Sequence, residues 1–237
     1  MVNRKLLIMF GPGINKLYIR DLKIENSLIK WITEQGYTLF VVSWVNPDAS
    51  YADVGMADYV EEGFMTAIRE AKAICNTKQV NAVGYCIAGT TLHLARALLA
   101  KRGDKSVRSA TFFTALTDFS EQGEFTPFLQ NDFVDGIENE VAQSGLLRSF
   151  YVSRTFSFLR SNDLIWSRIV RDYLMGERAA MNDLMAWNAD ATRMPYRMHS
   201  EYLRKLYLDN DFAEGRLKVA QQPVHLSDIR VPIFAVG

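Results

Sequence analysis

The sequence has few of the residues that make disulfides or bind metals. Its 237 residues include only two cysteines, Cys75 and Cys86, and three histidines, His93, His199 and His225. Two cysteines cannot form a disulfide framework, and their spacing matches no zinc motif. Because the histidines lie far apart in the sequence, a metal site built from them is not expected.

Charge of one sign and long hydrophobic runs are lacking as well. Lys plus Arg and Asp plus Glu both total 27, so the formal net charge is zero and nothing favours nucleic acid or an anionic membrane as a partner. No run approaches the roughly 20 apolar residues of a membrane span. The apolar run at 6–10 is shorter than the roughly 7–15 residues of a secretory signal. We therefore expect a cytoplasmic protein without a membrane span.

Strand and helix patterns alternate through the first half of the chain. Continuous apolar runs of strand length are typical of parallel strands that are covered on both faces. Apolar residues at helical spacing fill the intervals between these runs. In the longest of them Val60, Phe64, Ala67, Ile68, Ala71 and Ile74 are expected to point inward, with Cys75 in the core at its end. The predicted strands cover residues 5–10, 38–44, 79–85 and 109–116, and the predicted helices cover 25–35, 56–76 and 87–101. The alternation predicts an α/β fold with a doubly wound, mostly parallel sheet.

The pattern changes after Asp118. Residues 119–225 are rich in aromatic and polar residues, helical in pattern and without a clear strand, and a strand pattern returns at 231–237. We therefore divide the chain into a core over 1–118, a lid or cap insertion over 119–225 and a return to the core sheet over 226–237. The aromatic residues Phe156, Phe158, Trp166 and Trp187 are expected in the core of this lid, the side chain of Phe156 lying outside the part that the structure describes. Exposed aromatic residues of the lid would instead meet an apolar product or a partner subunit.

The segment 84–89, with the sequence GYCIAG, directly follows the apolar run at 80–83. A strand, a sharp turn of small residues that carries one nucleophile, and a helix form the nucleophile elbow of α/β-hydrolase folds. Cys86 is then the candidate nucleophile. The backbone amide of Ile87 and the Gly-rich loop at 11–15, represented by Ile14, are the candidate oxyanion donors. An inert cysteine in a close-packed turn has the same spacing and stays an alternative.

The chemistry expected of Cys86 is acyl transfer. Its place at a helix N-terminus favours the thiolate, which is the reactive form of cysteine. A thiol also accepts an acyl group from a thioester with little thermodynamic loss and passes it on to an alcohol. His93 lies almost two helical turns further on and is interpreted as a helix-face residue rather than a base. Asp118 follows a strand end, where it could be mistaken for the acid of a catalytic triad.

Six blocks of the sequence, in order, resemble the polyhydroxyalkanoate synthases. They are INKLYIRDL at 14–22, VSWVNPD at 42–48, the elbow GYCIAGT at 84–90, TFSFLRSNDLIW at 155–166, WNADATR at 187–193 and YLRKLYL at 202–208. Together they extend over essentially the whole chain. Two departures are small: Gly11-Pro12-Gly13 stands where the family more often has a Pro-Pro pair, and Ala88 stands where glycine is frequent.

The resemblance implies a cytoplasmic α/β-hydrolase-fold acyltransferase that polymerises (R)-3-hydroxyacyl-CoA into polyester granules and releases CoA. Cys86 matches the residue that carries the growing chain, no cofactor is implied beyond the CoA of the substrate, and a homodimer at the granule surface is expected. The family's aspartate and histidine lie downstream of the strand that 231–237 matches. The chain is therefore expected to be C-terminally truncated and not to polymerise alone. A thioesterase or esterase of the same fold and a non-catalytic granule-binding or dimerisation fragment are the alternatives.

Overall fold

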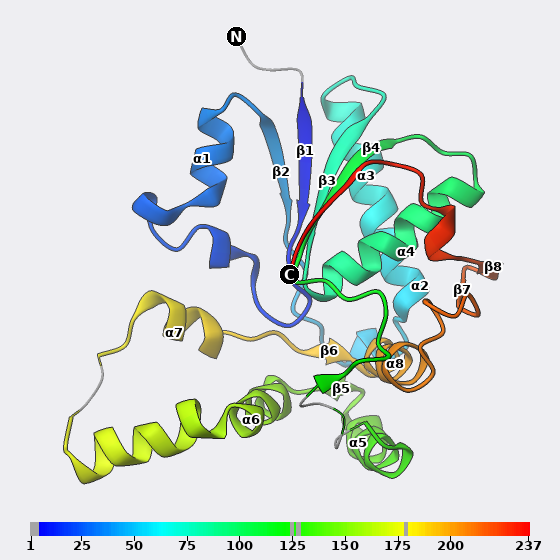
Figure 1. Cartoon of the computed structure of the whole chain (residues 1–237). Coiled ribbons are helices and arrows are strands. Elements are labelled where there is room, and N and C mark those ends of the chain that lie inside the picture. Colours follow the sequence, from blue (N-terminus) through cyan, green and yellow to red (C-terminus); the bar gives the residue numbers. More distant parts are fainter. Residues whose placement is uncertain (1–4, 124–125, 127–128, 178–179) are drawn as a thin grey trace.

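Five parallel strands form the central sheet, in the order β2-β1-β3-β4-β9 (Figure 1). The computed structural model describes residues 5–123, 126, 129–177 and 180–237. The strands are β1 (Leu6–Phe10), β2 (Thr38–Val42), β3 (Val80–Tyr85), β4 (Val107–Phe113) and β9 (Ile233–Val236). Gly84 lies opposite Phe10 on one side and Phe112 on the other, so the strands end at a common edge. The predicted parallel α/β sheet is confirmed.

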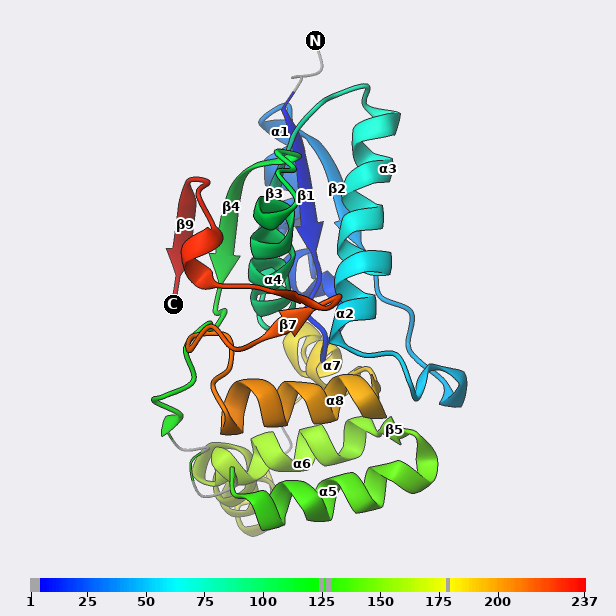
Figure 2. The ribbon, with the colours of Figure 1, turned by 90° about the vertical axis from the view of Figure 1, so that its right-hand side faces the viewer.

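Helices cover both faces of this sheet, because side chains of each strand alternate between the two faces. Leu6, Ile8 and Phe10 of β1 belong to the larger apolar core, under α3 (Thr66–Ile74) and α4 (Ile87–Lys101). Met9, between them, packs with Ile32 of α1 (Leu28–Glu34) on the opposite face. Figure 2 shows α3 and α4 lying across one face of the sheet.

The long helix predicted over 56–76 consists of three successive segments, α2 (Met56–Asp58), η4 (Tyr59–Met65) and α3. Its predicted inward positions Val60, Phe64 and Ile68 are buried, and Cys75 packs against the same core as expected. The inward position predicted for Ile74 is wrong, since this side chain is 70% exposed. Ile74 is the last residue of α3, where the helix has passed the end of the core. The shorter helices η1 (Leu17–Arg20), η2 (Ile24–Asn26) and η3 (Ala49–Tyr51) lie in the connections around β2.

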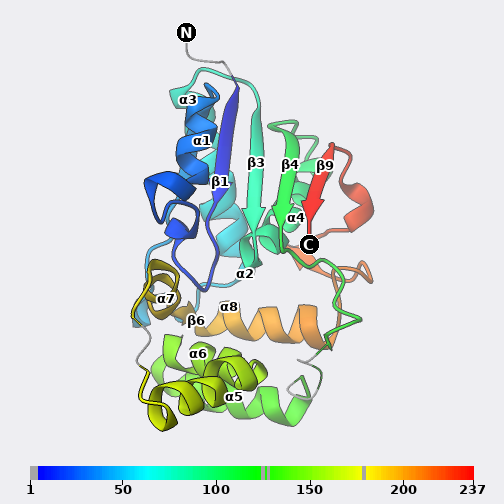
Figure 3. The same ribbon diagram turned by 60° about the vertical axis from the view of Figure 1, so that its left-hand side comes forward.

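A helical region lies beyond the carboxyl ends of the strands (Figure 3). It comprises α5 (Asn131–Ser144), α6 (Ser149–Leu159), η6 (Asn162–Trp166), η7 (Ile169–Leu174), α7 (Asp183–Ala189), α8 (Tyr196–Glu201) and η8 (Tyr202–Leu208), and η9 (Leu226–Asp228) follows it. The division of the chain at 118 and 225 stays a prediction. No helix among the described residues is both long and apolar enough to cross a bilayer.

Two details of this region differ from the sequence-based expectation. It contains two short ladders, β5 (Leu146–Leu147) with β6 (Met194–Pro195) and β7 (Lys218–Val219) with β8 (Gln222–Pro223). Strands of two residues are too short to produce a periodic pattern. Phe158 and Trp166, expected in the lid core, are 65% and 58% exposed, because the helices that carry them extend away from the sheet.

The contact between β3 and α4 is close because glycine stands on both sides of it. A Cβ atom added to Gly84 would lie 2.7 Å from the Cα of Gly89, and one added to Gly89 would lie 2.4 Å from the Cβ of Ala115. Real Cβ atoms do not come this near to other atoms, so neither position accepts a side chain without movement of its neighbours. The small residues predicted around Cys86 therefore have a steric cause.

We predict that Gly89→Ala lowers the free energy of unfolding by about 1–3 kcal/mol, because the added methyl group overpacks a fixed contact. Urea denaturation at neutral pH measures the change. Gly136→Ala is the matched control: Gly136 lies in α5 with no atom within 4 Å of an added Cβ. That substitution should leave the protein as stable or more stable, because alanine favours a helix over glycine. Equal effects at the two positions would contradict the steric explanation.

Candidate active site

Cys86 sits at the sharp turn between β3 and α4, where the sequence motif places it. Its φ of 57° and ψ of −132° lie in a region that non-glycine residues rarely adopt. The Cys86 amide donates to the Phe113 carbonyl at 3.0 Å, and the Cys86 carbonyl accepts from the Gly89 amide at 2.8 Å. Strand β4 and the first turn of α4 thus hold a conformation that costs about 1–3 kcal/mol by itself.

The thiol of Cys86 has a raised pKa, and burial is the larger cause. The backbone amide of Ile87 hydrogen-bonds the sulfur and lowers the pKa, but by less. The Ile87 amide at the helix N-terminus thus favours the thiolate, in the expected direction, but burial has the larger effect. The N-terminus of α4 was predicted correctly from the sequence, but the burial of the sulfur could not be. At neutral pH the resting group is the thiol.

The loop after β1 lies against the first turn of α4, with Gly13, the neighbour of the candidate Ile14, next to the candidate Ile87. A Cβ atom added to Gly13 would lie 3.6 Å from the Cβ of Ile87, and Ile14 follows Gly13 directly. Thr192 fixes this loop from the helical region. Its hydroxyl lies 3.1 Å from the Gly13 carbonyl and 2.9 Å from the Ile14 carbonyl, and its amide donates to the Ile14 carbonyl at 2.7 Å.

The end of α7 and the residue that follows it contact the same loop at further points. The indole of Trp187 donates to the carbonyl of Lys16 at 2.8 Å. The carboxylate of Asp190 accepts from the Tyr18 hydroxyl at 2.7 Å and pairs with the Lys16 ammonium at 2.6 Å. The blocks at 14–22 and 187–193 are far apart in the sequence, and nothing in the sequence predicted that they touch. Their contact means that the helical region sets the position of the loop.

A cluster of hydroxyl groups beside Cys86 was missed by the sequence analysis. Tyr202 and Tyr207 of η8 pack edge-on against Phe119 and against each other, with ring centroids 4.7–6.1 Å apart. Burial raises the pKa of both phenols, and the negative charge of an ionised Cys86 raises it further. These two tyrosines belong to the block at 202–208, where the helical pattern indicated only a packed face.

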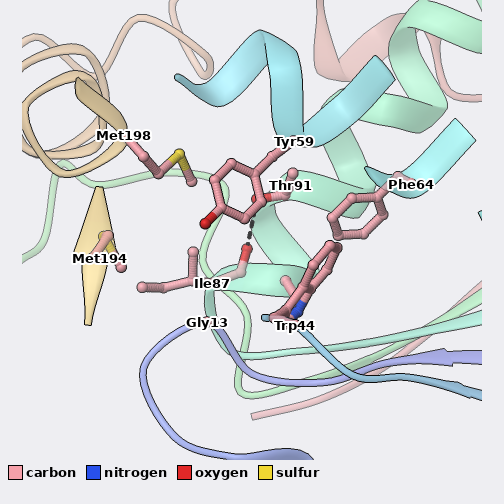
Figure 4. Close-up of a pocket in the computed structure, with 9 residues that line it drawn as sticks. Gly13, Trp44, Tyr59, Phe64, Ile87, Thr91, Met194 and Met198 are labelled. Carbon is pink, nitrogen blue, oxygen red and sulfur yellow. Dashed lines mark hydrogen bonds between the residues drawn. The ribbon is translucent and has the colours of Figure 1, made fainter. Parts of the chain in front are cut away.

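A small pocket lies next to the elbow (Figure 4). Its volume is about 310 Å³, including solvent at its mouth. Four elements supply mainly apolar side chains, and the hydroxyl of Thr91 donates to the Ile87 carbonyl at 3.0 Å. The lining residues are Gly13, Trp44, Tyr59, Phe64, Ile87, Ala88, Thr91, Met194 and Met198. The pocket suits a small hydrocarbon group rather than a charged one.

The three histidines have partners away from the thiol. Nδ1 of His93 lies 3.0 Å from the Gly89 carbonyl, and its ring stacks on Phe112 with centroids 3.5 Å apart. Burial lowers the pKa of His93 to about 4 and that of His199, in α8, also to about 4. His225 precedes η9, and its amide donates to Asp228 at 2.9 Å.

The acidic residues near the strand ends cap turns. Asp118 accepts from the Ser120 amide at 3.0 Å and from the Asn210 side chain at 2.8 Å. Asp48 accepts from the Ser50 amide at 3.0 Å. Among the residues described, no group of three or more His, Cys, Asp or Glu side chains forms a candidate metal site.

The relatives found by comparison with known proteins are named as members of one family. The poly(3-hydroxyalkanoate) polymerase of Methylorubrum extorquens is 41% identical over 233 residues, which are 98% of this chain and 38% of the relative. The poly(3-hydroxyalkanoate) polymerase subunit PhaC of Cupriavidus necator is 40% identical over 242 residues, 100% of this chain and 41% of the relative. The resemblance to the polyhydroxyalkanoate synthases is confirmed. No family model matches the chain.

The chain spans about two fifths of the length of these synthases. Among solved structures, a protein from Sulfolobus solfataricus whose name calls it a lipase has a TM-score of 0.56. The match covers 99% of this chain and 78% of that one at 11% identity, so it concerns the fold alone. The predicted α/β-hydrolase fold is confirmed.

We predict that Thr192→Val destabilises the protein by about 1–2 kcal/mol, because the partly buried carbonyls of Gly13 and Ile14 lose a hydroxyl donor. Urea denaturation is the measurement. Thr33→Val is the control, since the exposed Thr33 hydroxyl bonds only to carbonyls of its own helix. An equal loss in both variants would mean that Thr192 does not fix the loop.

A second prediction concerns pH. The folded-state pKa of His93, about 4, lies below the ordinary value of 6.5. The unfolded chain therefore binds a proton first as the pH falls, so the stability present above pH 6.5 is lost towards pH 4. In His93→Gln the loss between pH 7 and 4.5 should be smaller by about 1–3 kcal/mol. Urea unfolding at the two pH values measures it, and equal losses in variant and parent would refute the assignment.

Proposed function

We propose that this chain is the part of a polyhydroxyalkanoate synthase that holds the acyl-accepting cysteine. The reaction is the polymerisation of (R)-3-hydroxyacyl-CoA with release of CoA. One observation carries the proposal: in a chain 41% identical to a poly(3-hydroxyalkanoate) polymerase, the strained turn between β3 and α4 presents Cys86. Nothing in the chemistry requires a further cofactor, because CoA arrives on the substrate.

In the first step the Cys86 thiolate attacks the thioester carbonyl of the substrate. A bond forms between Sγ and the acyl carbon, the bond from that carbon to the CoA sulfur breaks, and the CoA thiolate takes up the proton that Cys86 has lost. The amide of Ile87, and that of Ile14 as the second donor, would face the oxyanion of the tetrahedral intermediate. The products are again a thioester and a thiol, so the exchange is nearly neutral in free energy.

In the second step the hydroxyl of another hydroxyacyl group attacks the acyl carbon on Cys86. An ester forms, the carbon–Sγ bond breaks, and the proton of the hydroxyl returns to the sulfur. This step needs a base, and the imidazoles of the three histidines face other groups: the Gly89 carbonyl for His93, Glu138 for His199 and Asp228 for His225. We assign the base to the aspartate–histidine pair that the resemblance places after the strand over 231–237. The 237 residues alone should then take up an acyl group without polymerising.

Two further features support the proposal. The pocket beside Ile87 is apolar, as the alkyl part of an acyl group requires. Phe158, Trp166 and Tyr173, on helices beyond the sheet, are exposed and offer an apolar surface. A homodimer contact and association with a polyester granule are proposed on this surface, in the cytoplasm, as the family resemblance implies.

The test is single-turnover acylation of the 237-residue protein by (R)-3-hydroxybutyryl-CoA, followed by mass spectrometry of the intact protein and its peptides. We expect one hydroxyacyl group on the peptide that contains Cys86, with one equivalent of CoA released. Cys86→Ala should abolish the label, whereas Cys75→Ala, which removes the other thiol, should retain it.

Each other outcome has a defined meaning. Steady release of free 3-hydroxybutyrate would show that water is the acceptor and would favour the thioesterase alternative. Absence of label on Cys86 in the folded protein would contradict the assignment of the nucleophile. In that case the non-catalytic alternative would lead, and binding to polyester granules would be measured with Cys86→Ala.

A further inference from the structure

One hydroxyl group of the pocket in Figure 4 is left without a partner in the part of the chain that the structure describes. Three lining side chains can donate a hydrogen bond, those of Trp44, Tyr59 and Thr91. The Trp44 indole donates to the Gly11 carbonyl at 2.9 Å, and the Thr91 hydroxyl donates to the Ile87 carbonyl at 3.0 Å. No described residue hydrogen-bonds the Tyr59 hydroxyl. Among these lining side chains, Tyr59 therefore holds the unused donor.

The packing of the Tyr59 ring fixes the direction of this hydroxyl. Tyr59 begins η4, and its ring packs against that of Trp44 with centroids 5.6 Å apart and planes inclined at 60°. Trp44 packs in turn on Phe64, with centroids 5.4 Å apart. The phenol oxygen lies on the axis about which the ring turns, so rotation of the ring does not move it. Figure 4 shows this oxygen pointing into the space between Ile87 and Met198.

The two hydroxyl groups of the pocket have complementary roles. Burial raises the pKa of Tyr59 to about 12, and a charge on Tyr51 adds to the effect, so the phenol keeps its hydrogen at neutral pH. The Thr91 hydroxyl has committed its only hydrogen to the Ile87 carbonyl, but its oxygen can still accept. The pocket thus offers one donor and one acceptor within an otherwise apolar lining. An alcohol, which accepts and donates, matches this pair.

The pocket adjoins the place where an acyl group on Cys86 would lie. Ile87 and Ala88, the two residues that follow Cys86, both line it, and successive Cα atoms are only about 3.8 Å apart. Gly13, from the facing loop, lines it as well. An acyl group on the sulfur, with its oxygen toward the Ile87 amide, would therefore have its carbon chain beside the pocket. The carbon that carries the 3-hydroxyl group is two bonds from the acyl carbon.

We propose that Tyr59 recognises the 3-hydroxyl group of the substrate by donating a hydrogen bond to it, while the Thr91 oxygen accepts the hydrogen of that group. The inference rests on the proposed function, in which Cys86 takes the acyl group of a 3-hydroxyacyl-CoA. An acyl chain without the hydroxyl would displace solvent from the phenol and offer it no acceptor, which weakens binding. Tyr59 thus favours 3-hydroxyacyl over plain acyl substrates.

The test compares two substrates that differ only in the 3-hydroxyl group, (R)-3-hydroxybutyryl-CoA and butyryl-CoA. Single-turnover acylation is measured in Cys75→Ala, so that Cys86 is the only thiol. We expect Tyr59→Phe to slow acylation by the hydroxy substrate about 3–10-fold, with the rate for butyryl-CoA unchanged. Tyr37→Phe, on the opposite face of the sheet, should keep the parent's ratio of the two rates.

A purely structural role predicts a different result. If Tyr59 only supports the pocket wall, Tyr59→Phe would slow both substrates by the same factor. That outcome, or a ratio equal to that of the parent, would overturn the proposal.

A binding measurement separates this inference from the proposed function. Titration calorimetry of Cys86→Ala with the same two thioesters requires no acyl transfer. The hydroxy compound should bind about 3–10-fold more tightly than butyryl-CoA, and adding Tyr59→Phe should remove the difference. A preference that depends on Tyr59, without label on Cys86, would contradict the proposed function alone. Equal affinities with normal labelling of Cys86 would contradict the inference alone, and failure of both measurements would contradict both.

Thermal unfolding verifies that each variant is folded. Tyr59→Phe removes a hydroxyl that has no partner among the residues described, so it should unfold at or above the temperature of the parent. If it does not fold, Thr91→Val removes the acceptor instead. The same fall in the ratio of the two acylation rates is expected, and an unchanged ratio would overturn the proposal.

Discussion

The close approach of α4 to β3 is the constraint on which the site depends. Gly84 and Gly89 face each other at a distance that leaves no room for a Cβ atom, and Ala115 closes the contact from the strand end next to them. Because the backbone is held on both sides, Cys86, which lies between the two glycines, adopts its rare backbone conformation. The contact between Gly84 and Gly89 thus fixes the direction of the Cys86 side chain and the position of the N-terminus of α4, including the Ile87 amide.

The second part of the site depends on a different kind of bond. The loop after β1 contains two glycines, Gly11 and Gly13, on either side of Pro12. Its position is set by hydrogen bonds to other segments, among them the helical region. Thr192 holds Gly13 and Ile14, while the Trp44 indole donates to the Gly11 carbonyl at 2.9 Å. The elbow is therefore rigid by packing, whereas the facing loop is placed by polar contacts. Movements of the helical region would reach the loop and leave the elbow in place.

The sequence predicted those features that depend on local patterns. The helix over 87–101 was predicted with its observed bounds, because a turn of small residues begins it and Gly103 follows it. The parallel sheet followed from continuous apolar runs. The raised thiol pKa, the exposure of Ile74 and Trp166, and the electrostatic influence of Cys86 on the phenols of Tyr202 and Tyr207 could not be predicted, since each depends on which distant segment packs nearby. A helical face looks the same in sequence whether it meets a core, solvent or a nucleophile.

The raised thiol pKa is compatible with acyl transfer between thiols. A less acidic thiol gives a more nucleophilic thiolate, although less of it is present at neutral pH. In the proposed exchange between the Cys86 thiol and a CoA thioester, the departing CoA sulfur regains the proton that Cys86 loses, so the cost of forming a buried thiolate does not enter the free-energy difference between reactants and products. Burial also makes the reactivity conditional, since the sulfur becomes nucleophilic only when a base removes its proton. In the proposed thioester the same burial would limit the access of water, which is the competing acceptor, to the acyl carbon.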